Sequence, residues 1–185
     1  MSATKHATSE RILTAAAHLF AANAYSEISV DEIAREAGLT KVTIYQHFGS
    51  KEKLFLECLR MRLARREAML DRFIEQLPAA SDPLLALFDW LETWLDPKNF
   101  KGCAFVKAVN ELAAAMPEVC RIAADAKEAM RDRFTTLAKA SGRPHAADLG
   151  QELALLFEGA QSLALIESSA RPARIARRIA QGLLR

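Results

Sequence analysis

The stretch from Ser29 to Lys51, SVDEIAREAGLTKVTIYQHFGSK, constrains the fold of this chain more than any other part of the sequence. Ser29 and Glu32 have the spacing of a capping box, in which each side chain binds the backbone amide of the other residue. Ile28 and Ile33 flank them at the spacing of a hydrophobic staple. Gly38 can take the left-handed conformation that commonly ends a helix. The sequence therefore predicts a short helix that begins at Ser29 and stops at Gly38.

A second short helix is expected directly after this one. Thr40 is a typical helix-capping residue, and Leu39 and Ile44 again have the staple spacing. Two helices joined by a tight turn, with the small Ala34 where they would cross, predict a helix-turn-helix motif. In that motif the second helix enters the major groove of DNA, and its N-terminal residues reach base edges. The expected base-contacting residues are Thr40, Lys41, Val42, Thr43 and Gln46.

The segment Ala34 to Phe55, AREAGLTKVTIYQHFGSKEKLF, resembles the DNA-binding domain of the TetR family of bacterial transcriptional regulators. The resemblance covers Arg11 to Leu54 and includes the Ala-Gly turn, the I-Y-x-H-F run at Ile44 to Phe48 and the S-K-E-x-L run at Ser50 to Leu54. Many members of the family carry Gly where this chain has Val42, so base preference does not transfer. The resemblance implies an N-terminal DNA-binding domain followed by a larger helical domain for effector binding and dimerisation.

Four residues are expected to contact the phosphate backbone of DNA, which fixes position without reading sequence. Ser29 and Lys51 stand at helix N-termini, where unpaired amides and the positive end of the helix dipole favour a phosphate. Tyr45 and His47 lie close in sequence to Phe48, which is expected to point inward, and the resemblance implies that both contact phosphate. The expected phosphate contacts are Ser29, Tyr45, His47 and Lys51.

The composition predicts an all-α protein, because the 185 residues include only seven Gly and six Pro. We expect a three-helix DNA-binding domain at residues 1–50 and an effector-binding and dimerisation domain at 51–185, linked by a long helix at about 51–77. Further helices are expected at 83–95, 103–115, 117–140, 146–168 and 171–184, between breaks at Pro and Gly. Residues 1–51 hold five basic and five acidic residues, so the DNA-binding prediction rests on the motif and not on charge.

The expected second domain is rich in aromatic residues, which favour one of two arrangements. They either form the core of a helical bundle or line an apolar cavity with a few polar groups, as in most small-molecule sites. The resemblance favours a cavity for a small-molecule effector whose identity the sequence does not specify. The expected lining of this cavity is Phe88, Trp94, Phe105, Val109, Asn110 and Gln161.

Two apolar stripes near the C-terminus predict a subunit interface. Their members are Leu149, Leu153, Leu156, Ala160 and Leu163, and then Ile175, Ile179 and Leu183. Helices 146–168 and 171–184 from two subunits would form a four-helix interface, as the resemblance implies for a homodimer. The same stripes could instead close the core of one subunit. A dimer would place two recognition helices about 34 Å apart and so read a near-palindrome.

Other classes of function have little support in the sequence. There is no Glu-x-x-His metal pair, Gly-rich phosphate loop or nucleophile elbow, so we expect no enzyme, no metal and no cofactor. No apolar run reaches the length of about 18 residues that a membrane span requires. Cys58, Cys103 and Cys120 fit a reducing compartment, so a cytoplasmic protein without a membrane partner is expected. Whether any of these cysteines senses redox state stays open.

The predicted function is that of a dimeric transcription regulator that binds double-stranded DNA, acts as a repressor and is released by a small-molecule effector. The alternative is a helical dimeric interaction protein that has lost specific DNA binding, which would fit the balanced charge of residues 1–51. Tyr45, His47 and Lys51 favour the first interpretation over the second.

Overall fold

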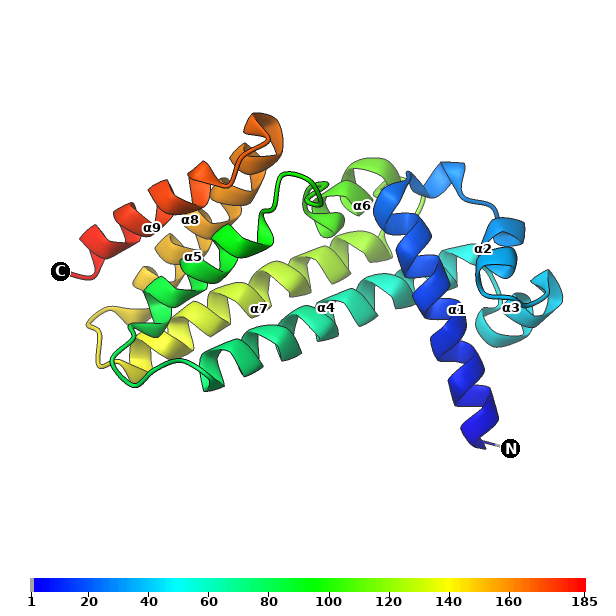
Figure 1. The fold of residues 1–185 in the computed structure, drawn as a ribbon, viewed down its shortest axis with the longest axis horizontal. Helices are drawn as coiled ribbons and strands as arrows, with labels where there is room; N and C mark the ends of the chain where they lie inside the picture. The colour runs from blue at the N-terminus through cyan, green and yellow to red at the C-terminus, as the bar shows by residue number, and fades with distance from the viewer. Residues whose placement is uncertain (1) are drawn as a thin grey trace. The chain divides into compact units, whose positions relative to one another are not determined.

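A computed structural model describes residues 2–185, with side chains from Lys5 onward, as helices joined by short turns (Figure 1). No strand occurs among these described residues, which confirms the predicted all-α fold. The short 3-10 helix η1 (Tyr25–Glu27) lies between α1 and α2. The α-helices of the described residues are α1 (Ser2–Ala22), α2 (Val30–Glu36), α3 (Lys41–Phe48), α4 (Lys51–Glu75), α5 (Pro83–Trp94), α6 (Ala104–Leu112), α7 (Glu118–Ala140), α8 (Ala146–Glu167) and α9 (Arg171–Leu183).

The chain divides into two compact units. The first unit consists of Met1–Arg65 and Ala104–Ala123, and the second of Arg66–Cys103 and Ala124–Arg185. Helices α4 and α7 therefore contribute residues to both units. The grouping of α6 with the N-terminal helices was not expected from the sequence. The predicted domain boundary near residue 50 stays a prediction.

The core of the first unit is built from one aliphatic residue on each of its first four helices. Ile12 of α1, Ile33 of α2, Ile44 of α3 and Leu54 of α4 are each no more than 1% exposed. Burying side chains of this size stabilises a fold by about 1.5–3 kcal/mol each. Ile44 thus holds α3 by its inner face, which leaves the outer face of this helix open to solvent.

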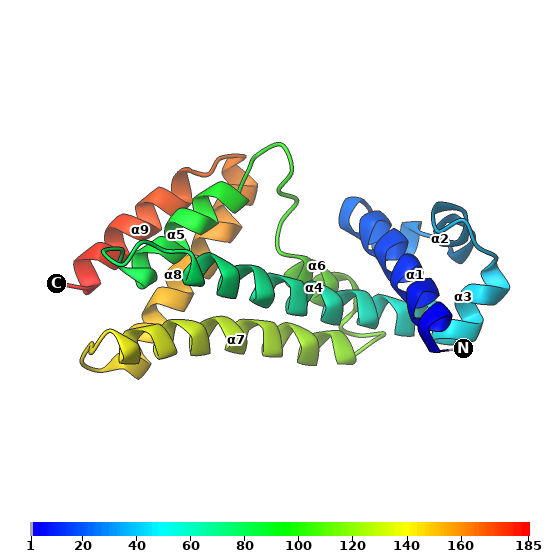
Figure 2. The ribbon, with the colours of Figure 1, turned by 60° about the horizontal axis from the view of Figure 1, so that its bottom comes forward.

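Three aromatic side chains form the centre of the second unit. Phe88 of α5, Phe134 of α7 and Phe157 of α8 are almost fully buried, and their ring centres lie 5.6 to 6.1 Å apart. This spacing falls in the favourable range for aromatic pairs. Helix α9 lies beside α5 and α8 in both views (Figures 1 and 2). The second unit is therefore a bundle with an aromatic centre.

The helices near the C-terminus divide the predicted interface stripe between two environments. Leu149, Leu153 and Ala160 are buried in the core of the second unit, whereas Leu163 is 51% exposed. The buried members cannot form a subunit interface, because they already pack against α5 and α9 or their neighbours within one chain. The apolar residues that repeat at intervals of three and four therefore lie partly on the buried face of α8 and partly on its exposed face.

Candidate nucleic-acid interface

The start of α2 is fixed by the predicted capping box. Ser29 Oγ accepts a hydrogen bond from the Glu32 amide at 3.2 Å, and the Ser29 amide donates to Glu32 Oε2 at 2.7 Å. The bonds from the Ser29 amide and hydroxyl hold the pKa of Glu32 below its ordinary value. Gly38 has φ +60°, the left-handed conformation that the sequence predicted at the end of this helix. Both local predictions are confirmed.

The N-terminus of α3 is capped by Thr40. Thr40 Oγ1 accepts from the Thr43 amide at 3.2 Å and lies 2.9 Å from Thr43 Oγ1. Because the Thr40 hydroxyl also binds the Thr43 hydroxyl, the first role of both side chains is to cap the start of α3. The turn between α2 and α3 is closed by the Leu39 amide, which donates to the Ala34 carbonyl oxygen at 2.9 Å.

The outer face of α3 carries the residues that could reach DNA. Val42 is 64% exposed and Tyr45 is 42% exposed, and Lys41 and Gln46 are also exposed. Lys41 Nζ lies 3.0 Å from Asp31 Oδ2 of α2. The hydrogen bond to Asp31 raises the pKa of Lys41, so this side chain is a stable cation. The exposed side of α3 therefore offers a cation, an apolar group, a phenol and an amide on a helix fixed by its inner side.

Comparison with known proteins identifies this arrangement. Residues 12–58 match the family model described as bacterial regulatory proteins, tetR family. The fold is similar to a TetR-family transcriptional regulator from Streptomyces coelicolor, with a TM-score of 0.83, 26% identity, and coverage of 96% of this chain and 94% of that one. Residues 12–58 therefore belong to the TetR family. A TetR regulator from Chloroflexus aurantiacus is similar as well, with a TM-score of 0.79, 25% identity, and coverage of 96% and 93%.

The HTH-type transcriptional regulator EthR of Mycolicibacterium smegmatis is 33% identical to this chain over 107 residues. The matched part is 58% of this chain but spans only 48% of EthR.

Three of the four expected phosphate-binding residues already form hydrogen bonds within the chain. His47 Nδ1 lies 2.8 Å from Ser9 Oγ of α1, and the hydroxyl and amide of Ser29 are bound by Glu32. Tyr45 remains exposed. Lys51 is half-buried, and its Nζ donates to the carbonyl oxygen of Tyr25 at 2.7 Å. Ser29, Tyr45 and His47 belong to the α2–α3 motif and Lys51 begins α4, but contact with DNA stays a prediction for all four.

The environment of Lys51 was not expected from the sequence. Its Nζ lies 4.0 Å from the centre of the Tyr25 ring, within the range of a cation–π interaction. Burial lowers the pKa of Lys51, although Glu52 and Glu111 act in the opposite direction. Burial and a hydrogen bond to Glu52 raise the pKa of the Tyr25 phenol. No motif marks Tyr25, and only its aromatic side chain close before α2 could have drawn attention to it.

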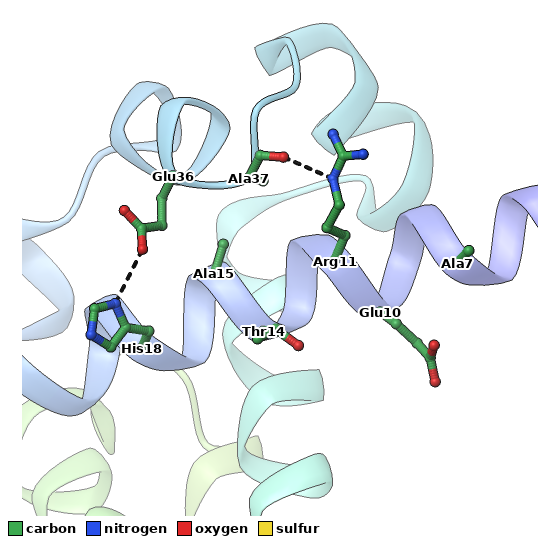
Figure 3. Close-up of a pocket in the computed structure, with 8 residues that line it drawn as sticks. All are labelled: Ala7, Glu10, Arg11, Thr14, Ala15, His18, Glu36 and Ala37. Carbon is green, nitrogen blue, oxygen red and sulfur yellow. Dashed lines mark hydrogen bonds and ion pairs between the residues drawn. The ribbon is translucent and has the colours of Figure 1, made fainter.

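An open groove of about 590 Å³ lies along α1 and the end of α2 (Figure 3). Its lining is Ala7, Glu10, Arg11, Thr14, Ala15, His18, Glu36 and Ala37. Arg11 Nε donates to the Ala37 carbonyl oxygen at 2.9 Å, and His18 Nδ1 lies 3.2 Å from Glu36 Oε1 (Figure 3). These bonds join α1 to α2, so the polar groups of the groove brace the motif. None of the residues expected to bind an effector lies in it.

The residues expected to line the effector site belong to both units. Phe105, Val109 and Asn110 lie on α6 in the first unit, whereas Phe88, Trp94 and Gln161 lie in the second. Phe88 is fully buried in the aromatic centre described above, and Asn110 is exposed. Gln161 is 5% exposed and is thus a buried polar side chain on α8. The effector site stays a prediction.

The three cysteines differ in environment. Burial raises the pKa of the Cys58 thiol to about 12, which keeps it protonated and unreactive. Cys103 Sγ accepts a hydrogen bond from Lys127 Nζ at 3.3 Å, and Cys120 is exposed. Within the described residues, no three potential metal ligands gather, and none of the helices has the length and apolar character to cross a membrane.

Proposed function

We propose that this TetR-family protein is a homodimeric repressor that binds a near-palindromic operator and leaves it when a small molecule binds. The first observation in support is the arrangement of α3. Ile44 is buried in the core of the first unit, while Lys41, Val42 and Gln46 face solvent. A helix that is anchored by its inner face and presents donors, acceptors and an apolar group outward has the form needed to read a major groove.

We assign separate roles to the residues around α3. Lys41, Thr43 and Gln46 would contact base edges with Thr40 at the helix start, and Val42 would meet a thymine methyl group. Ser29, Tyr45, His47 and Lys51 would contact phosphate. To contact DNA, Thr43 and Ser29 would have to share or exchange the hydrogen bonds that they now make within the chain.

The exposed apolar face of α8 and α9 supports the homodimer. Leu155 and Ile166 of α8 are 76% and 77% exposed, and Ile179 and Leu183 of α9 are also exposed. Gly159 lies between Leu155 and Ile166 on α8, and a Cβ at this position would meet nothing within 4 Å. Large apolar side chains around a small residue favour close contact between helices of two subunits. A four-helix interface formed by α8 and α9 would cover this face.

The aromatic residues of α5 support a small-molecule site in the second unit. Trp90 and Trp94 stack with their ring centres 5.7 Å apart, and Phe100 lies 5.1 Å from Trp94 edge to face. All three are only half-buried. Their partly exposed apolar surface, with Gln161 as a polar group on α8, would suit an apolar or aromatic effector. Binding there would alter the separation of the two recognition helices and reduce the fit to both half-sites.

The deciding experiment is a fluorescence anisotropy titration with a duplex from the DNA upstream of the gene, at low and moderate salt. We expect tighter binding than to a scrambled duplex of equal length. Absence of binding at low salt would favour the alternative, a dimeric interaction protein. Release would then be tested with small aromatic molecules that raise the melting temperature, since a ligand of the native state stabilises it.

A further inference from the structure

The peptide group between Tyr25 and Ser26 is held from two sides by oppositely charged side chains. Its carbonyl oxygen accepts a hydrogen bond from Lys51 Nζ of α4 at 2.7 Å. Its N–H donates to Glu111 Oε1 of α6 at 3.0 Å. Charge-assisted hydrogen bonds are the stronger kind, and bonds at the two ends of one peptide polarise each other. Glu111 and Lys51 are thus linked through a single peptide group.

Helix α6 makes several bonds to this segment. Glu111 also accepts from the Tyr25 amide at 3.1 Å and from the Ser26 hydroxyl at 3.2 Å. One turn earlier on α6, Lys107 Nζ donates to the Asn23 carbonyl oxygen at 2.8 Å. Burial acts to raise the pKa of Glu111, but the amides of Ser26 and Tyr25 outweigh it and the pKa lies below its ordinary value. Glu111 is therefore ionised when it binds these donors.

Helix α4 holds the same segment from its other side. The Tyr25 hydroxyl donates to Glu52 Oε1 at 3.1 Å, and the ring lies edge to face with Phe55 at 5.0 Å. The next residues along the chain lead directly to Ser29, the cap of α2. A displacement of the Tyr25–Ser26 peptide would therefore act on Lys51 and on the start of the α2–α3 motif together.

The geometry points to Glu111 as a positioning residue for DNA binding: through the Tyr25–Ser26 peptide it holds Lys51 and the start of α2 where the motif meets DNA. The inference rests on the proposed DNA-binding function and adds to it a residue from α6, outside the matched DNA-binding region. The hydrogen bonds of Glu111 go to Tyr25 and Ser26 and not to the predicted base-reading face, so it acts on DNA binding through these residues.

The experiment compares Glu111→Gln with Glu128→Gln, which removes the same charge from an exposed position of α7. Because Glu111 is itself partly open to water, we expect Glu111→Gln to weaken binding to the upstream duplex by about fivefold relative to Glu128→Gln. Glu111→Asp keeps the charge but is too short to reach both amides, so it should resemble Glu111→Gln. Circular dichroism confirms that each variant is folded before titration.

Coupling through the peptide is tested with Lys51→Met. The double variant that combines Glu111→Gln with Lys51→Met should bind the upstream duplex no more weakly than Lys51→Met alone. The NMR chemical shift of the Ser26 amide proton should change in both single variants. Equal affinities of Glu111→Gln and Glu128→Gln, or fully additive losses in the double variant, would overturn the positioning role. If Glu111→Gln does not fold, Lys107→Met takes its place and should also weaken binding. Failure of the unsubstituted protein to bind would instead refute the proposed function.

Discussion

Gly150 of α8 lies so close to Thr135 of α7 that a Cβ at residue 150 would be 2.2 Å from Thr135 Oγ1 and 2.8 Å from its backbone nitrogen. Because backbone atoms cannot move aside as a side-chain tip can, Gly150→Ala should destabilise the protein by about 1–3 kcal/mol. Urea denaturation measures the change. Gly182→Ala, where a Cβ meets nothing within 4 Å, is the control and should be neutral or stabilising. Equal effects of the two substitutions on the free energy of unfolding would show that α7 and α8 can move apart without destabilising the protein.

Lys51→Ala should weaken binding to all DNA sequences alike and reduce the magnitude of the salt slope by about 1 for each phosphate that the variant no longer neutralises. It should also lower the free energy of unfolding by about 1 kcal/mol, because alanine can neither bind the Tyr25 carbonyl nor place a cation over the Tyr25 ring. Anisotropy at several salt concentrations and urea denaturation measure the two effects. The exposed Lys53 provides the stability control, since Lys53→Ala should leave unfolding nearly unchanged.

Gln46→Ala should alter base preference without altering stability, because Gln46 is exposed on the outer face of α3. Removing a good hydrogen bond to a base edge costs about 1–3 kcal/mol at that base pair only. Binding to a set of operators with single base-pair changes would show the preference relaxed at one position in each half-site. A uniform weakening over the whole set would contradict the role assigned to this residue.

Ile166→Glu should raise the dimer dissociation constant by at least about tenfold, because it places a charge on the exposed apolar face of α8, near the turn that leads to α9. The chain itself should stay folded, since Ile166 is 77% exposed. Sedimentation velocity measures the change in assembly. Met69→Glu introduces the same charge in place of another apolar side chain, at a 45% exposed position of α4, and should leave the dimer intact. A monomeric unsubstituted protein would refute the interface outright.

The helix-turn-helix could be predicted in detail because its signals are local. The capping box at Ser29 and the left-handed Gly38 depend on residues a few positions apart, and the structure has both. The all-helical class followed in the same way from composition and from breaks at Pro and Gly.

The surroundings of Tyr25 could not be predicted, because they depend on a partner far away in the chain. The Tyr25 amide and Glu111 are 86 positions apart, and neither residue belongs to a recognisable pattern. The α8 stripe was predicted incompletely for a different reason. A helix that is apolar on two sides gives the same repeat for its core face and its exposed face, and only packing against the other helices separates Leu153 from Ile166.

The pairing of Lys41 with Asp31 means that this cation carries a counterion tethered by the chain itself. A lysine that meets DNA normally releases a mobile salt ion, whereas in the proposed complex Lys41 would have to exchange a carboxylate that cannot diffuse away. The gain in entropy from ion release is then absent for this residue. Only a base edge that replaces Asp31 as the hydrogen-bond acceptor of Lys41 would compensate for the lost ion pair. On a DNA sequence without such an acceptor, the Asp31 carboxylate would face the negatively charged groove. In the proposed complex the Lys41–Asp31 ion pair would thus act as a competitor that penalises the wrong operator more than the right one.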